Sequence, residues 1–318
     1  MKALITGITG FAGSYLAEQL LSTGNYEVSG TYLTDDSLNN VSGIESKINL
    51  IKADLSQEKN VFDIVKNVSP SVVFHLAALT SPADSFRNPI ATLNNNISLQ
   101  VNLFEAIRKF NLLDTKILVT SSADIYGLVK PEDLPIDEQT PLMPANPYSV
   151  SKIAQDYLGL SYFLSYKLKT IRVRPFNHIG PRQSPHFVVS SFAKQIAEIE
   201  KGKRDSILKV GNLEAKRDFT DVKDMVRAYV LAIEKGKDGE VYNIGSGISY
   251  KIADILSKLI SMSKSEIKIE KDMTLFRPGD TPDMICDSSK FTKLTGWKPT
   301  VAIDKTLEDT LDYWRNII

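Results

Sequence analysis

Short apolar runs alternate with longer amphipathic segments through the first half of the chain. The short runs have the length and apolar character of strands buried on both faces, and the longer segments repeat their apolar positions with helical spacing. The predicted strands are Ala3–Thr6, Glu27–Gly30, Asn49–Lys52, Val72–His75, Ile117–Thr120 and Thr170–Val173, and the predicted helices are Ala12–Ser22, Val61–Asn67, Ala91–Phe110 and Pro147–Leu164. This alternation predicts an α/β fold with a parallel sheet covered by helices.

The pattern changes after Pro175, where residues 177–185 are rich in Pro, Gly and polar side chains. Beyond them the sequence predicts helices at His186–Glu200, Val222–Glu234, Lys251–Met262 and Leu307–Ile317, with strands at Leu208–Val210 and Val241–Ile244. We therefore expect a large nucleotide-type domain, residues 1–174, and a smaller C-terminal α/β domain, residues 175–318. A return of the segment 222–244 to the first domain stays open.

Three glycines, Gly7, Gly10 and Gly13, follow the first strand directly and open the first helix. Glycine at this spacing permits a tight turn and a close approach of the backbone to a pyrophosphate, and the start of the helix offers free N–H groups. An ordinary glycine-rich turn is the alternative. The position at the head of an alternating domain favours a dinucleotide-binding loop.

The end of the second strand does not decide between NAD and NADP. A carboxylate there would bind the ribose 2′-hydroxyl of NAD, and an arginine would accept the 2′-phosphate of NADP. The chain has Tyr32 and Leu33, followed by Thr34, Asp35 and Asp36. The two aspartates slightly disfavour a 2′-phosphate if they point inward, although a solvated loop is their simpler role. Asp54, after the third strand, is a candidate for the adenine edge.

Tyr148 and Lys152 lie four residues apart, hence on one face of a helix. A phenol with a pKa near 10 is a poor base at neutral pH, and a neighbouring positive charge favours its ionised form. Such a pair can exchange a proton with a substrate hydroxyl or carbonyl, although the spacing also occurs on ordinary surface helices. Ser122 and Asp124 follow a predicted strand, at the edge where open α/β sheets bind ligands. The four residues together predict a catalytic site.

Charge and composition exclude several other classes of protein. Lys and Arg number 38 and Asp and Glu number 38, so the formal net charge of +0 lacks the broad basic surface of a general nucleic-acid binder. The single cysteine, Cys286, cannot form an internal disulfide, which favours a reducing compartment. The longest apolar runs, such as Val72–Leu79, are far shorter than the roughly 18 residues of a membrane span. We expect a cytoplasmic protein without nucleic-acid or membrane partners.

Several segments carry a resemblance to a known family over essentially the whole chain. They are Thr6–Gly13, His75–Ala78, Asn96, Ser121–Gly127 and Tyr148–Lys152, and they resemble the extended short-chain dehydrogenase/reductases that modify nucleotide sugars. Phe176–Pro181, His186–Val188, Gly211–Phe219, Arg277–Pro278 and Gly296–Pro299 resemble the branch that acts on GDP-sugars. That branch contains GDP-mannose 4,6-dehydratases and GDP-4-keto-6-deoxy-mannose reductases. The resemblance implies a Rossmann-type doubly wound parallel sheet with a smaller C-terminal α/β substrate domain.

The resemblance also implies roles for individual residues. Tyr148 is then the general acid/base, Lys152 lowers its pKa and holds the nicotinamide ribose, and Ser122 steadies the sugar 4-oxygen. The implied NAD or NADP site comprises Gly7, Thr9, Gly10, Phe11, Gly13, Tyr32, Asp54, Leu55, Leu76, Ala77, Ala78, Asn96, Thr120, Tyr148, Lys152, Phe176 and His178.

Four residues are expected on the nucleotide diphosphate side of the substrate: Asn177, Val188, Arg217 and Arg277. Arginine suits this role because its planar guanidinium makes paired hydrogen bonds to phosphate. A local ion pair with Asp218 is the alternative for Arg217, and a simple loop cation is the alternative for Arg277. No metal site is expected, since His178 has no ligand spacing with the other histidines.

The choice between reductase and dehydratase depends on few positions. Both reactions start with hydride transfer at C4, but a dehydratase must also remove the C5 proton, for which the dehydratases use a glutamate aligned with Asp124. Aspartate is one methylene shorter, and a misplacement of about 1 Å can cost on the order of a hundredfold in rate. The dehydratases also have an arginine pair and a longer insertion after the second strand, where this chain has Leu33–Thr34. We therefore expect NAD(P)-dependent reduction of the 4-keto group of a GDP-6-deoxy-hexulose, with GDP-mannose 4,6-dehydration as the alternative.

Two further alternatives stay open. A UDP-sugar 4-epimerase is disfavoured by Phe187–Val188. A non-catalytic dinucleotide sensor would need the glycine loop but not Tyr148, Lys152 and Ser122 together. The resemblance finally implies a homodimer through a four-helix interface formed by Ala91–Phe110 and Pro147–Leu164, with Tyr157, Leu158, Leu160, Tyr162 and Phe163 as candidate apolar surface. Packing of these side chains on their own sheet is the alternative.

Overall fold

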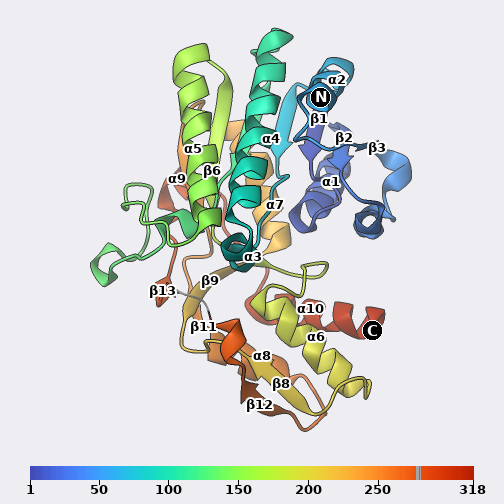
Figure 1. Ribbon diagram of the computed structural model, residues 1–318, viewed down its shortest axis with the longest axis vertical. Helices are drawn as coiled ribbons and strands as arrows, with labels where there is room; N and C mark the ends of the chain where they lie inside the picture. Colours follow the sequence, from blue (N-terminus) through green and yellow to red (C-terminus); the bar gives the residue numbers. More distant parts are fainter. Residues whose placement is uncertain (277–278, 280) are drawn as a thin grey trace.

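The computed structural model describes residues 1–276, 279 and 281–318. Its larger part is built on a sheet of seven parallel strands (Figure 1). Its order is β10-β6-β5-β4-β1-β2-β3. The strands are β1 (Lys2–Thr6), β2 (Glu27–Tyr32), β3 (Asn49–Lys52), β4 (Val72–His75), β5 (Lys116–Thr120), β6 (Lys169–Pro175) and β10 (Val241–Ile244). The order reverses between β1 and β4, and ligands of such sheets bind beyond the carboxyl ends of the strands at this point.

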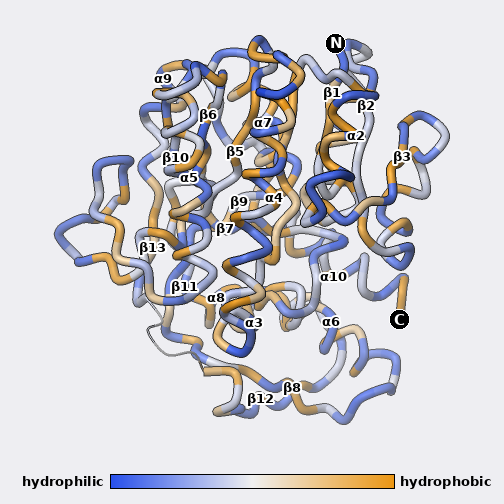
Figure 2. Tube along the Cα trace, turned by 45° about the horizontal axis from the view of Figure 1, so that its top comes forward, coloured by the Kyte–Doolittle hydropathy of each residue, from blue (hydrophilic) through white to orange (hydrophobic). Residues whose placement is uncertain are grey.

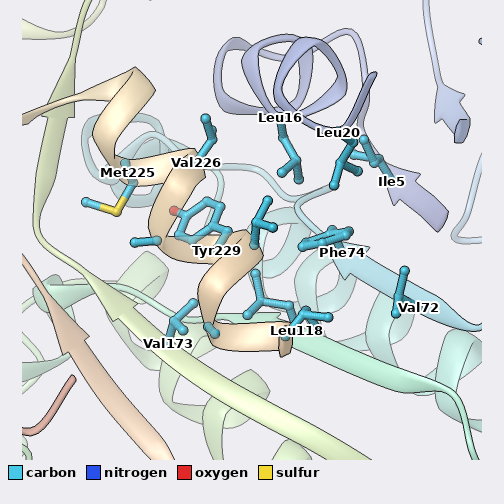
Figure 3. Packing of buried hydrophobic residues seen from close by; sticks show 14 of the residues in the cluster. Ile5, Leu16, Leu20, Val72, Phe74, Leu118, Val173, Met225, Val226 and Tyr229 are labelled. Atoms are coloured by element: carbon cyan, nitrogen blue, oxygen red, sulfur yellow. The ribbon is translucent and has the colours of Figure 1, made fainter. Parts of the chain in front are cut away.

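Helices cover both faces of this sheet. One face carries α1 (Phe11–Thr23), α7 (Val222–Lys235) and α9 (Ser289–Thr295), and the other carries α2 (Glu58–Val68), α4 (Pro89–Lys109) and α5 (Pro147–Tyr166). Because side chains of a strand alternate between faces, Ile5 packs with the first group of helices and Leu4 with the second. In Figure 3, Leu16 of α1 and Tyr229 of α7 lie over Phe74 of β4. The tube of Figure 2 is correspondingly hydrophobic along β1 and β5.

A smaller part with its own apolar core lies beyond the carboxyl ends of the large sheet (Figure 1). One of its sheets contains β9 (Lys216–Asp221), β7 (Asn177–Ile179), β11 (Ser249–Lys251) and β13 (Asp283–Met284), and the other pairs β8 (Ile207–Val210) with β12 (Lys268–Lys271). Its helices are α6 (Val188–Glu200), α8 (Ile252–Ser261) and α10 (Ile303–Ile317). The short helix α3 (Pro82–Arg87) precedes α4.

The predicted elements of the first half are all present, and their ends differ by at most three residues. The sequence missed α3, α9, β7, β9, β11, β12 and β13. Strand β12, for example, is exposed at every position and so has no apolar period, and β7 lies within the segment rich in Pro and Gly.

The chain crosses between the two parts more than once. The segment 222–244, whose place the sequence left open, returns to the larger part: β10 forms an edge strand of the large sheet and α7 packs on one of its faces. Phe291 and Trp297 also pack in the core beneath α7, although they lie near the C-terminal end. In the ranges that the structure describes, no helix combines the length and the apolar character needed to cross a lipid bilayer.

Candidate active site

A cleft of about 720 Å³ lies at the carboxyl ends of β1, β4 and β5, a size typical of small-molecule sites. The cleft brings together most of the residues that the sequence singled out. These are Gly7, Thr9, Gly10, Phe11, Gly13, Tyr32, Asp54, Leu55, Leu76, Ala77, Ala78, Thr120, Ser122, Asp124, Tyr148, Lys152, Phe176, Asn177, His178 and Arg217.

The glycine loop leaves no room for side chains. Gly7 has φ 72°, and a Cβ on Gly13 would lie 2.2 Å from the Gly7 carbonyl oxygen. Helix α1 begins next to this turn, at Phe11, without a side-chain cap and without an acidic residue in its first turn. An uncapped helix start that lines a cleft is suited to binding an anion.

A fixed turn holds the end of β4 against this loop. The Thr6 hydroxyl accepts the backbone N–H groups of Leu76 and Ala77, at 3.1 Å each, and lies 2.9 Å from Nδ1 of His75. Burial, together with the positive charge of Lys152, lowers the pKa of His75 to about 3. His75 is therefore a neutral structural side chain.

Tyr148 and Lys152 reach the cleft from the first two turns of α5. The Asn146 side chain accepts the Ser149 N–H at 2.8 Å and so caps the helix directly before them. Both side chains are buried, and the Lys152 ammonium donates to the Thr120 carbonyl at 2.9 Å, at the end of β5. Its Nζ lies 6.0 Å from the centre of the Tyr148 ring.

The electrostatics of this pair differ from the sequence prediction. Burial raises the pKa of Tyr148 above its ordinary value, the Asp124 carboxylate raises it further, and a hydrogen bond with Ser122 lowers it only in part. Burial also lowers the pKa of Lys152 to about 7, so the lysine loses part of the charge that the prediction relied on. The residues of the chain alone thus keep the phenol protonated, in the form that can donate a proton.

One buried carboxylate fastens α5 to β6 behind the site. Asp156 accepts from Arg172 at 2.6 Å and from Arg174 at 2.9 Å, and all three side chains are at most 7% exposed. Arg174 also donates to the Tyr126 hydroxyl at 2.9 Å. Since Tyr126 belongs to the turn that carries Ser122, this network joins that turn to the helix of Tyr148.

Two predicted ligand residues do not line the cleft. Asn96 is completely buried, and its amide bonds Leu79 and Ser151, so it joins the loop after β4 to α5. Val188 starts α6 and packs in the core of the smaller part, while Phe187 lines the cleft beside it. Arg277 lies outside the described residues.

Arg217 lines the cleft and donates to the Thr281 carbonyl at 2.7 Å. The Asp218 carboxylate, by contrast, accepts the backbone N–H groups of Ser246, Gly247 and Cys286. Asp218 is therefore a structural acceptor, and the guanidinium of Arg217 faces the cleft side of the same strand.

The sequence missed Arg182, which lines the cleft next to helix α1. Its guanidinium lies 2.7 Å from the Glu18 carboxylate and 4.5 Å from the centre of the Tyr15 ring. In the sequence, Arg182 directly follows the segment Phe176–Pro181, which carried part of the resemblance. The sequence does not predict its backbone φ of 69°, which is uncommon for arginine.

Comparisons with known proteins agree with this arrangement. The sequence model of the family described as GDP-mannose 4,6 dehydratase matches residues 4–310. The chain is 36% identical over 247 residues to the GDP-6-deoxy-D-mannose reductase of Pseudomonas aeruginosa, covering 78% of this chain and 81% of that protein. The solved structure of RMD from Pseudomonas aeruginosa complexed with NADPH matches with a TM-score of 0.86 and 31% identity, over 100% of this chain and 99% of that one. The UDP-glucuronic acid 4-epimerase from Bacillus cereus, in complex with UDP-glucuronic acid and NAD, matches with a TM-score of 0.89 and 28% identity over 100% of both chains. The chain therefore belongs to the GDP-mannose 4,6-dehydratase family, within the extended short-chain dehydrogenase/reductases that act on nucleotide sugars.

Proposed function

We propose that the protein reduces the 4-keto group of a GDP-6-deoxy-hexulose such as GDP-4-keto-6-deoxy-mannose, with NADH or NADPH as the reductant. The observation that carries the proposal is the buried phenol of Tyr148 beside Ser122 and Lys152, in the cleft that also contains the glycine loop. Burial raises the pKa of this phenol and so favours its protonated form. The relative from Pseudomonas aeruginosa, a GDP-6-deoxy-D-mannose reductase, supports the choice of substrate.

The residues of the cleft fit a nicotinamide dinucleotide. Gly7, Gly10 and Gly13 leave space for a pyrophosphate at the uncapped start of α1, where free N–H groups stabilise its charge. The Thr120 hydroxyl is buried in the cleft wall without a hydrogen-bond partner, and Lys152 lies beside it on the proposed ribose side. When bound, the reduced cofactor supplies a hydride to the carbonyl carbon.

The side chains of the protein would manage the proton and the developing charge. Tyr148 donates its proton to the 4-oxygen as that oxygen gains negative charge, and Ser122 donates a hydrogen bond to the same oxygen. Lys152 stabilises the phenolate that remains. The negative charge of this phenolate in turn favours the charged form of the Lys152 ammonium, because an opposite charge nearby raises the pKa of an amine.

Dehydration of GDP-mannose is the second candidate. The family description and the position of Asp124 in the cleft favour it, since a carboxylate there is a candidate base for the C5 proton. The shorter aspartate and the short connection after β2 favour the reductase.

An assay with two substrates tests the proposal. We expect GDP-4-keto-6-deoxy-mannose to be consumed together with NADH or NADPH, in a 1:1 ratio that follows from transfer of one hydride per carbonyl. Absorbance of the reduced nicotinamide and chromatography of the GDP-sugar measure the two quantities. Loss of water from GDP-mannose without consumption of reduced cofactor would overturn the reductase in favour of the dehydratase. Turnover of UDP-glucose alone would indicate an epimerase.

We also propose a division of labour along the chain. The large sheet, residues 1–174 with the segment 222–244, would bind the dinucleotide, and the remainder of 175–318 would bind the sugar nucleotide through Asn177, Arg217 and Arg277. The proposed location is the cytoplasm, which suits the single buried thiol of Cys286.

A homodimer through α4 and α5 is part of the proposal. Val150, Tyr157 and Leu164 follow one another at seven-residue spacing on α5 and are each at least 45% exposed, an apolar stripe that a partner helix would cover. Of the side chains expected on this surface, Tyr157 is exposed, while Leu158 and Tyr162 pack against the apolar core between α4, α5 and the sheet.

Sedimentation of the Tyr157→Arg variant tests the dimer. We expect the wild-type protein to sediment as a dimer and the variant as a monomer, because an arginine in the stripe would be buried without a partner. Ile317→Arg is the matched control, since Ile317 on α10 is equally exposed, at 54% against 51%. A monomeric wild-type protein, or dissociation by the control as well, would contradict the interface.

A further inference from the structure

The segment after β2 forms one wall of the cleft. Tyr32, Leu33, Thr34, Ser37 and Asn40 all line it, the last two from a 3₁₀ helix, η1 (Asp35–Val41). In sheets of this topology the adenosine ribose of a dinucleotide lies at the end of the second strand. This wall therefore meets the position at which NAD carries a 2′-hydroxyl and NADP a 2′-phosphate.

The polar groups of this wall are neutral and bonded to one another. The Thr9 hydroxyl lies 2.7 Å from the Ser37 hydroxyl, and the Asn40 amide donates to the Thr9 carbonyl at 2.9 Å. A hydroxyl pair and an amide can exchange hydrogen bonds with a ribose hydroxyl, which is both a donor and an acceptor. They bring no positive charge to a phosphate.

The charged groups next to this wall are unfavourable to a 2′-phosphate. Lys52, at the end of β3, donates to the Asp35 carboxylate at 2.5 Å, so its charge is already balanced. Asp36 adds a negative charge in the same turn of η1. Leu33, 63% exposed, stands directly after the strand, where a cation would reach the phosphate.

The cations that do line the cleft lie elsewhere. Within the described ranges these are Lys152 at the end of β5, Arg182 on the flank of α1 and Arg217 on β9. Lys152, bonded to Thr120, lies on the proposed nicotinamide side, and Arg182, paired with Glu18, lies beside the glycine loop. Arg217, bonded to Thr281, lies on the side of the smaller part. None of the three belongs to the wall formed by residues 32–40.

From this arrangement we infer that the protein selects NAD(H) over NADP(H), with Leu33 as the position that decides against the 2′-phosphate. The inference rests on the proposed use of a nicotinamide dinucleotide. A phosphate dianion at this wall would lose water without gaining a cation, and an unpaired charge is expected to weaken binding by at least about tenfold.

Equilibrium titration with NADH and with NADPH, followed by the fluorescence of the reduced nicotinamide, tests the inference without relying on turnover. We expect the Kd of NADH to be at least about tenfold lower than that of NADPH at low ionic strength. In the Leu33→Arg variant we expect the ratio of the two constants to fall by about tenfold or more, through tighter binding of NADPH.

Leu79→Arg is the matched control, because Leu79 is also an exposed leucine of the cleft but follows β4. A general gain of positive charge would act on both cofactors in both variants, whereas a contact with the 2′-phosphate acts on NADPH in Leu33→Arg alone. Equal affinities, or tighter binding of NADPH by the wild-type protein, would overturn the inference while leaving the proposed function intact. An unchanged ratio in Leu33→Arg would overturn the role of Leu33. Binding of neither cofactor would overturn both the inference and the proposed function.

Discussion

Replacement of Tyr148 by phenylalanine is expected to lower kcat for carbonyl reduction by about 10²- to 10⁴-fold, the usual contribution of a positioned proton donor. The change removes one hydroxyl from a side chain that is 7% exposed, so the packing of α5 is retained. The hydroxyl is the proton source that the site holds ready, because burial and Asp124 keep the pKa of the phenol high. The Kd of the reduced cofactor should stay within a few-fold of wild type.

Steady-state kinetics together with cofactor titration separate these two effects. Tyr229→Phe is the matched control: Tyr229 is a second buried tyrosine of the same cleft, but it extends from α7 on the opposite face of the sheet (Figure 3). The control should keep kcat within a few-fold. If Tyr148→Phe retains more than a tenth of kcat, or if the control loses as much, Tyr148 is not the proton donor. A signal or binding output that persists without any turnover in the wild-type protein would instead indicate a sensor.

Asp156→Ala is expected to lower the free energy of unfolding by about 3–5 kcal/mol, because removal of one partner leaves buried charges uncompensated. Two guanidinium groups, from Arg172 and Arg174, share this one carboxylate, which is completely buried. The Nε of Arg172 is already without a hydrogen-bond partner, so the site has no spare acceptor to take over.

Urea unfolding at constant m-value measures this loss. Asp114→Ala is the control. Asp114 forms an ion pair with Lys169, which lies on β6 like Arg172 and Arg174, but the Asp114 side chain is completely exposed. Exposed pairs contribute about 0–1 kcal/mol, so the control should be close to wild type. A loss below about 1 kcal/mol in Asp156→Ala would contradict the stated role of the network.

The sequence was sufficient to predict those features that follow from local residue patterns alone. Apolar runs of strand length predicted the first six strands, and the spacing of Gly7, Gly10 and Gly13 predicted a turn that excludes side chains. The four-residue spacing of Tyr148 and Lys152 predicted their common face on α5.

The sequence was insufficient where a property depends on surroundings that the fold creates. The pKa of Tyr148 rises because its surroundings exclude water, and no local pattern records that burial. Asn96 was predicted to bind the cofactor, but its side-chain amide forms hydrogen bonds with Leu79 and Ser151. The packing of α4 on α5 brings these partners close to Asn96, and no local sequence pattern indicates this packing. Arg182 depends on a left-handed backbone in a loop, and β7 pairs with a strand about forty residues away.

The return of the chain to the large sheet also sets the order in which the protein can mature on the ribosome. Helix α7 covers the face of the sheet that contains Phe74 and Leu118, and Phe291 and Trp297 complete the same core. A nascent chain that has emerged only to residue 174 therefore exposes that face to water, and edge strand β10 is still missing. The core of the large sheet is therefore complete only after residues 222–244, Phe291 and Trp297 have also left the ribosome.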